Sequence, residues 1–223
     1  MDMQPAAAAE TLMASRSGRS PQPGSARAIL KHATSDIHET IHHLPRFARL
    51  ANGTSTSNEY SFSLKRLLGF HEPLELALRA AGDALAACSC RRIPPVRARE
   101  TAHLLRANLI DLGVAPSEIR AMPLCTTLPA LTSGDAIMGC LHVIEEAALG
   151  GRFLANKLTG MLGGVAGRRF LFGRPEPDPL PWAVFCRLLE SQAAEGDPVL
   201  IAASARSTFE SFEQWLRADG NYV

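Results

Sequence analysis

The sequence predicts an all-α fold on three observations. The chain has 223 residues, 46% hydrophobic and 20% charged, a balance typical of a globular protein with a buried core. Aromatic residues make up only 6%, so the core must consist mainly of Leu, Ala, Val and Ile, which favours packed helices over an aromatic-rich sheet. Apolar residues recur at steps of three and four, whereas we find no period-two strand series and no long repeat. We therefore predict a single all-helical domain, a bundle of about six to eight helices.

Charge and cysteine usage narrow the range of functions. Lys and Arg number 23 against 22 Asp and Glu, a formal net charge of +1, so the chain has no basic excess with which to bind nucleic acid. The five cysteines are odd in number, and Cys88 and Cys90 form C-x-C, which lacks the spacing of a zinc knuckle. We interpret the cysteines as reduced thiols in a reducing compartment.

The ends and apolar runs of the chain predict a cytoplasmic protein with no membrane span. No apolar run approaches the roughly 18 to 20 residues that cross a bilayer. The N-terminal stretch lacks the basic start and continuous apolar centre of a secretory signal. We expect residues 1–25 to form a flexible tail, residues 26–218 the helical domain and residues 219–223 a C-terminal tail.

The apolar pattern in the first part of the domain predicts two helical segments. Over residues 25–47 the apolar positions follow a helical period, and Pro45 marks the end. Residues 51–58 are turn formers and predict a loop. The helical period resumes over residues 59–88, where we expect Pro73 to kink or divide the helix, because proline has no amide hydrogen and its ring clashes with the preceding turn.

Three further helices lie on either side of a long central segment. Residues 96–114 predict a helix that ends at Gly113, and Pro116 lies in the short loop that follows. After a proline-rich connection, two amphipathic helices over residues 181–192 and 197–217 close the domain.

The central segment, residues 133–164, is the most informative. Ser133 or Asp135 is suited to cap its start, and an apolar stripe follows. Gly150 and Gly151 fall in its middle, where each costs about 1 kcal/mol relative to Ala. One interpretation is close packing of this helix on a neighbour. The other is a flat ligand that lies against a bare, locally bent backbone.

Histidines cluster on the first helix. His38 and His42 are four residues apart and share one helix face, and Lys31 lies two turns before His38 on nearly the same side. The other two members are His32 and His43. A solvated helix face is the simplest interpretation. The alternatives are an anionic ligand or a metal, including a haem iron, which needs only one axial imidazole.

A metal bound by protein side chains alone is less well supported. Zinc or a pair of irons needs three or more protein ligands, usually with carboxylates among them. No histidine follows Glu145 or Glu146 at helical spacing, which weakens the di-iron interpretation.

Several motifs and their order resemble the haem oxygenase family. Residues 30–38 read L-K-H-A-T-S-D-I-H, similar to the family's pattern L-[KR]-x-A-T-x-x-x-H, whose last residue is the proximal iron ligand. Residues 145–153 read E-E-A-A-L-G-G-R-F, similar to the distal-helix pattern E-G-x-x-L-G-G of bacterial, biliverdin-producing members. R-R-F-L, P-W-x-x-F and A-x-x-x-F-x-x-F-x-x-W-L follow in the same order. The resemblance covers Ala26 to Arg217 and implies one all-α domain with haem between a proximal and a distal helix.

The resemblance also implies roles for individual residues. His38 would be the proximal ligand of the haem iron, and Lys31 matches a basic residue that meets a haem propionate. Arg187 is a candidate for a second propionate contact, with a solvated charge as the alternative. Gly150 matches the distal glycine whose missing side chain leaves room for dioxygen, and Gly151 continues that bare backbone.

Three positions depart from the family pattern. Glu146 stands where the family usually has Gly. Four placements of its side chain are open: over the haem, paired with a cation, holding a water molecule, or pointing away from the site. Ala147 stands where mammalian-type members have an Asp that organises distal water. His42 stands where some members carry a Glu that accepts the proton of the ligand imidazole.

The activity implied by the resemblance is oxidative cleavage of haem to biliverdin, carbon monoxide and ferrous iron. It uses O2 and electrons from an external reductant, a separate reductase or ferredoxin, and haem is both cofactor and substrate. A bacteriophytochrome is a candidate acceptor of the biliverdin. The departures at Glu146 and Ala147 keep a non-catalytic haem-binding or carrier protein open as the main alternative. A helical interaction protein without haem and a di-iron oxidase are the others.

Overall fold

The structure is a computed structural model of the chain, and it describes residues 21–87, 96, 100–162, 164–173 and 181–218. The predicted tails at residues 1–20 and 219–223, as well as Cys88 and Cys90, lie outside the described residues. Within the described part every regular element is a helix, which confirms the all-α prediction.

Seven helices in the described part have eight or more residues, within the predicted range. They are α2 (Ala26–His42), α3 (Pro45–Asn52), α4 (Ser57–Ala87), α5 (Ala102–Asp111), α7 (Gly134–Lys157), α10 (Trp182–Glu195) and α11 (Pro198–Arg217). Three shorter helices, α6 (Pro116–Arg120), α8 (Thr159–Leu162) and α9 (Arg169–Phe172), connect them.

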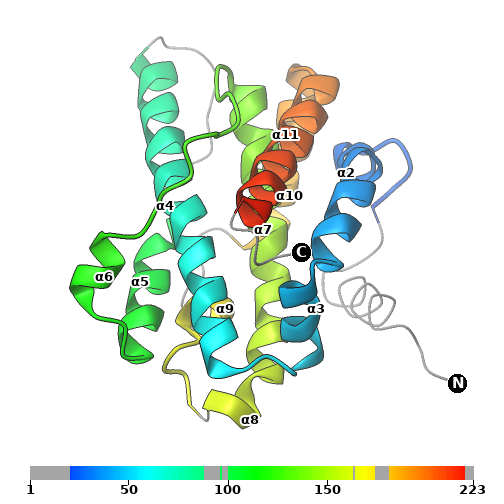
Figure 1. The fold of residues 1–223 in the computed structure, drawn as a ribbon. Helices are drawn as coiled ribbons and strands as arrows, with labels where there is room; N and C mark the ends of the chain where they lie inside the picture. The colour runs from blue at the N-terminus through cyan, green and yellow to red at the C-terminus, as the bar shows by residue number, and fades with distance from the viewer. Residues whose placement is uncertain (1–20, 88–95, 97–99, 163, 174–180, 219–223) are drawn as a thin grey trace, which may run out of the picture.

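Helix α7 runs through the middle of the fold (Figure 1). Helix α11 packs along both α7 and α2, and α10 contacts both of these helices as well. Helices α4, α5 and α9 pack together on the other side of α7. The two sides of α7 therefore have different neighbours, α10 and α11 on one and α4 and α9 on the other.

Each side has its own apolar cluster. The α2 core joins α2, α7, α10 and α11 and includes Leu30, Ile137, Leu141, Phe185 and Ile201. The α5 core joins α4, α5, α9 and the end of α7 and includes Tyr60, Leu64, Leu105, Leu109 and Leu158. Most of these side chains have almost no exposed surface, and burying a side chain of this size contributes about 1.5 to 3 kcal/mol.

The close contact between α7 and α11 depends on a glycine. A Cβ added to Gly139 would lie 2.2 Å from the carbonyl oxygen of Ile201 and 2.8 Å from the amide of Ala205. Only a residue without a side chain lets the two backbones approach so closely. Asp135 fixes the same pair of helices at their start, because its Oδ2 accepts a hydrogen bond from the amide of Asp197 at 3.1 Å.

Proline 73 does not divide its helix, contrary to one of the two expectations. Helix α4 runs without a break from Ser57 to Ala87 with Pro73 inside it. A proline leaves the carbonyl four residues earlier without its helical donor, and that carbonyl belongs to Gly69. Here the amide of Cys125 donates to the Gly69 oxygen at 2.8 Å, so the loop after α6 replaces the missing hydrogen bond.

The start of α5 also differs from the expectation of a helix over residues 96–114. The helix begins at Ala102, because the buried carboxylate of Glu75 accepts the amides of Thr101 and Ala102 at 2.6 and 2.9 Å. A side-chain acceptor at these amides fixes the first turn. Pro116 lies not in a loop but in the first turn of α6, a position that proline favours.

Candidate functional site

One face of α2 carries most of the predicted ligand-binding residues. Lys31 and His38 are seven residues apart, roughly 20° around the helix, and His42 follows His38 by roughly 40°. The two imidazoles touch, with 3.3 Å between their Nε2 atoms and 4.5 Å between ring centroids. On the α11 side, the ring of Phe209 meets His38 edge-on at 5.7 Å between centroids.

His38 is neutral at ordinary pH. Burial, together with the nearby His42 and Lys31, lowers its pKa from 6.5 to about 4. A neutral imidazole with a free nitrogen lone pair is the form that binds a metal. The His42 contact is made at Nε2 of His38, so Nε2 can bind a metal only after His42 has moved away.

The facing side of α7 presents a carboxylate. The side chain of Glu146 is 32% exposed, and its Oε2 lies 3.6 Å from Nε2 of His142, one turn earlier. Burial raises the pKa of Glu146, while the positive charges of Arg27 and Lys31 on α2 oppose that shift. The charges of α2 and the carboxylate of α7 are therefore within electrostatic reach of one another.

Electrostatic coupling links the two helices. Arg27 acts on His142, and Arg27 and Lys31 both act on Glu146. Helices α2 and α7 run in the same direction in Figure 1.

The two predicted glycines have different surroundings. Gly150 is half-buried and shares a helix face with Glu146, four residues earlier. Gly151 is buried, and a Cβ there would lie 3.0 Å from the carbonyl oxygen of Leu171 in α9. The backbone of Gly151 is thus needed for close packing on α9, which is the first of the two interpretations of the pair.

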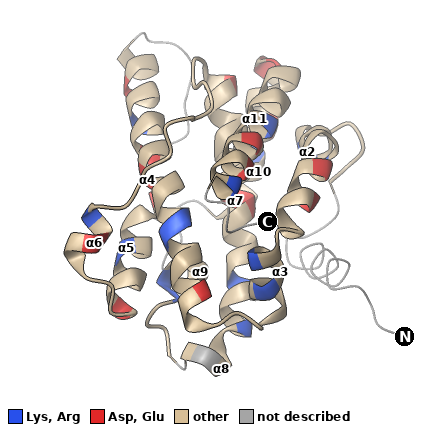
Figure 2. Ribbon diagram, viewed as in Figure 1, with Lys and Arg blue, Asp and Glu red and all other residues tan. Residues whose placement is uncertain are grey.

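Arg187 is exposed on α10, and its charge acts on the thiol of Cys186. His38 and His42 are in contact, and the charge of Lys31 acts on both His38 and Glu146, but the structure shows no contact between Arg187 and these four residues. Figure 2 shows basic and acidic positions spread over the helices without a face of one sign.

Two neighbours of the site, Arg27 and His142, were not identified from the sequence. His142 is buried beside Trp182 and Phe185, with ring centroids 6.0 and 6.3 Å away. The guanidinium of Arg27 lies over the ring of Trp182, 5.4 Å from its centroid. The available signal was spacing: Arg27 precedes Lys31, and His142 precedes Glu146, by four residues each.

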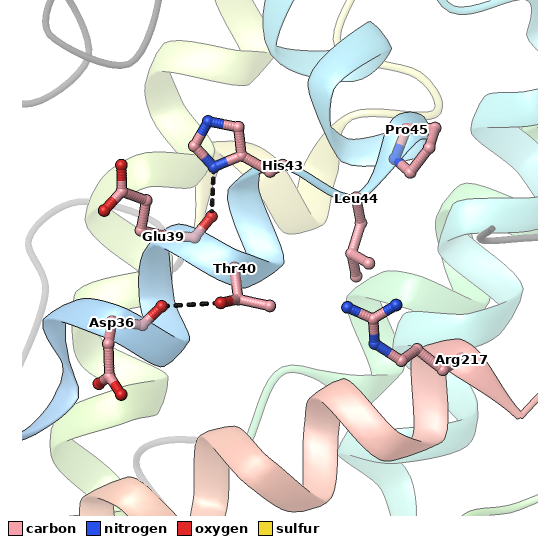
Figure 3. A pocket seen from close by; sticks show the side chains of 7 residues that line it. All are labelled: Asp36, Glu39, Thr40, His43, Leu44, Pro45 and Arg217. Atoms are coloured by element: carbon pink, nitrogen blue, oxygen red, sulfur yellow. Dashed lines mark hydrogen bonds between the residues drawn. The ribbon is translucent and has the colours of Figure 1, made fainter.

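A surface pocket lies elsewhere on α2. It has a volume of about 490 Å³ and is lined by Asp36, Glu39, Thr40, His43, Leu44, Pro45 and Arg217 (Figure 3). Asp36 lies roughly 160° around the helix from His38, so the pocket opens on a different face. His43 and Thr40 donate to carbonyl oxygens of their own helix at 2.8 and 2.9 Å, and their polar groups are thus already engaged.

Other site types find little support in the part of the chain that the structure describes. No group of three or more His, Cys, Asp or Glu there is placed to hold a metal ion, and Cys125, Cys140 and Cys186 are free thiols. No described helix combines the length and apolar character that crossing a bilayer requires.

Comparison with known proteins gives one informative relative. A protein of Xanthomonas campestris pv. campestris (strain 8004) named "Heme oxygenase" is 32% identical over 182 residues, covering 76% of this chain and 96% of the relative. No family model matches the chain. The chain belongs to the haem oxygenase family. The all-α architecture agrees with this membership, as the sequence motifs predicted.

The residues present fit a haem. A single neutral imidazole, His38, stands half-buried on α2, and Lys31 offers a cation of the kind that pairs with a carboxylate such as a propionate. Phe209 supplies apolar surface beside the imidazole. Two groups must move for a haem to enter, His42 from Nε2 of His38 and Glu146 from the vicinity of Lys31.

Proposed function

We propose that the chain is a haem oxygenase that cleaves haem to biliverdin, carbon monoxide and ferrous iron with O2 and external electrons. Family membership supports an enzyme of this kind. The observation that carries the proposal is the half-buried imidazole of His38, which is neutral at pH 7, lies against Phe209 and is influenced by the charge of Lys31. Bound haem would be the substrate and would also supply the iron that activates dioxygen.

Each residue of the group has a distinct part in this proposal. His38 binds the iron, and Lys31 pairs with a propionate and so fixes how the flat ligand is turned about its axis. Arg187 is proposed as a second and weaker propionate partner from α10. Gly150 presents bare backbone on the α7 side, which limits the side-chain bulk near bound oxygen.

Two of the residues that depart from the family pattern, Glu146 and His42, also have parts in this proposal. The family's distal Asp is replaced by Ala147, whereas Glu146 carries a carboxylate one turn before Gly150. We propose that Glu146 holds water there through its carboxyl group, whose pKa is raised by burial. Once the ring of His42 has moved away from Nε2 of His38, we propose that His42 accepts a hydrogen bond from the remaining N–H of the His38 imidazole.

The remaining parts of the reaction come from other molecules. Electrons would arrive from a separate reductase or a ferredoxin, and we place the reaction in the cytoplasm. The biliverdin would either accompany iron recovery or pass to a bacteriophytochrome as its chromophore.

The experiment that tests the proposal is a haemin titration followed by reduction. Wild-type protein is expected to give a saturable Soret band, and ascorbate or a ferredoxin with its reductase should then abolish that band and yield a bilin. His38→Ala should shift or weaken the band, whereas His32→Ala, at an exposed position of the same helix, should leave it unchanged. Intact haem after reduction by several donors would refute catalysis.

A haem carrier on the same scaffold is the second candidate. The observation in its favour is the carboxylate of Glu146, which replaces the family's glycine and faces Arg27 and Lys31. A carrier predicts a His38-dependent Soret band that persists under reduction. If Glu146 is what prevents turnover, Glu146→Gly should restore bilin formation, and the same substitution in an active enzyme should lower it.

A further inference from the structure

The imidazole of His142 is a buried titratable group near the proposed site. Its residue is 3% exposed, and the aromatic rings of Trp182 and Phe185 lie beside it at 6.0 and 6.3 Å between centroids. Burial and the charge of Arg27 lower its pKa to about 4, so the ring is neutral at pH 7 and carries one proton.

The surroundings decide which nitrogen holds that proton. Nδ1 of His142 is buried and has no hydrogen-bond partner, whereas Nε2 faces Oε2 of Glu146 at 3.6 Å. Placing the proton on Nδ1 would bury an unpaired donor and would turn the Nε2 lone pair toward a carboxylate oxygen. The tautomer with the proton on Nε2 avoids both costs.

Glu146 has competing partners on two helices. Its own helix offers the N–H of His142, and α2 offers the positive charges of Arg27 and Lys31. A rotation of the Glu146 side chain that shortens the gap to His142 by about 0.5 Å makes a full hydrogen bond. A ligand carboxylate that pairs with Lys31 would push Glu146 toward the same position.

We propose that His142 is a positioning residue for Glu146: its Nε2–H donates to Oε2 and holds the carboxylate on α7, away from Arg27 and Lys31. The positive charges of α2 are thereby left available for the anionic edge of the ligand, and the carboxylate stays one turn from Gly150. This inference rests on the proposed haem site for its purpose but not for its geometry, which exists in the haem-free protein.

The direct test is ¹⁵N and ¹H NMR of the histidine side chains in the haem-free protein. His142 should be the Nε2–H tautomer, and its ring proton should exchange slowly and shift upfield in Glu146→Gly. His71 is the matched control, because it is also buried, also has a pKa lowered to about 4 and also has an unpartnered Nδ1, but it packs on Phe170. Its signals should not change.

The second test is a double-mutant cycle read out as haemin affinity. His142→Phe keeps the aromatic packing and removes the donor, and it should weaken haemin binding about threefold or more, with partial rescue by His142→Gln. In the Glu146→Gly background His142→Phe should have no effect. An Nδ1–H tautomer, or His142 signals that ignore Glu146→Gly, would overturn the proposal. Absence of haemin binding with the NMR result intact would overturn only the proposed function.

Discussion

The two sides of α7 use buried polar groups in opposite ways. Toward α9, the guanidinium of Arg168 donates to the carbonyl oxygen of Ala155 and to Oγ1 of Thr159 at 2.5 and 2.8 Å. Toward α2, Glu146 stands 3.6 Å from His142 and shares the charges of α2 without a short contact in the structure. On the α9 side the buried guanidinium makes short hydrogen bonds. On the α2 side the charged groups influence one another without a short contact.

Further contacts on the α5 side are also short hydrogen bonds. The hydroxyl of Tyr60 donates to the carbonyl oxygen of Gly167 at 2.6 Å, and Asp111 accepts the amide of Gly167 at 2.9 Å. Such groups stabilise a fold because each buried donor meets an acceptor. Loosely held charges cost stability instead, so their retention beside α2 indicates a function.

Acid unfolding should show the largest effect, and it compares the two sides directly. His71 toward α9 and His142 toward α2 both have pKa values lowered from 6.5 to about 4 by burial. Between pH 4 and 6.5 the unfolded chain binds more protons than the folded chain. The contribution of these histidines to the free energy of unfolding is therefore fully present above pH 6.5 and is lost as the pH drops toward 4. The free energy of unfolding should change by about 1.4 kcal/mol per pH unit for each histidine. Over the whole pH range this amounts to about 3 kcal/mol for each of the two residues.

Urea unfolding from pH 7.5 to 4.5 measures this slope. His71→Phe and His142→Phe should each flatten the profile by an equal amount. A clearly smaller change in His142→Phe would mean that water reaches α7 from the α2 side, and that the two sides differ in burial as well as in partners.

Arg168→Met should have the next largest effect. The substitution keeps an apolar stem but removes the donors to the buried carbonyl oxygen of Ala155 and to the exposed hydroxyl of Thr159, and this loss should cost about 3 kcal/mol of unfolding free energy. Glu146→Gly on the other side should change stability by less than about 1 kcal/mol, because a poorly partnered carboxylate is lost. Equal losses in urea unfolding at pH 7 would remove the contrast between the sides.

The sequence was a good guide to elements and a partial guide to their neighbours. Helical periodicity located every helix of ten or more residues, because the period is a local property of the chain. It missed α3, which begins at Pro45, where the sequence predicted the end of a helix. The unbroken path through Pro73 was not predictable, since it depends on the Cys125 amide, 52 residues further on. The start of α5 was missed for a similar reason, because Glu75 lies on another helix.

The candidate site shows the same limit. Spacing alone placed Lys31, His38 and His42 on one face, and the structure brings Glu146 to them across α2 and α7. His142 was overlooked because its importance lies in its burial against Trp182 and Phe185, two residues of another helix. The packing of Gly151 on α9 was equally invisible, because Leu171 follows it by 20 residues in the sequence.

The adjacent glycines give a sharper comparison of the two sides, with an effect of intermediate size. Gly151→Ala gains about 1 kcal/mol of helix propensity but forces a Cβ to within 3.0 Å of the Leu171 carbonyl, for a net loss of about 1 kcal/mol. Gly150→Ala should keep the propensity gain in haem-free protein and instead lower oxygen affinity or bilin yield. Thermal unfolding and haem assays of both variants would contradict this division if Gly150→Ala destabilised the haem-free protein more.

The smallest effects should come from the exposed cations proposed to meet the propionates. Lys31 acts on both His38 and Glu146, so Lys31→Gln should weaken haemin binding about three- to fivefold, the range of an exposed ion pair. Arg187 is exposed on α10 and acts on Cys186, so Arg187→Gln should change the affinity by less than about twofold. Lys65→Gln removes the same unit of charge on the α5 side, where Lys65 pairs with Glu118, and controls for net charge. If Arg187→Gln weakened binding more than Lys31→Gln, the anionic edge of the ligand would lie along α10, and the charges that matter would no longer be those that compete for Glu146.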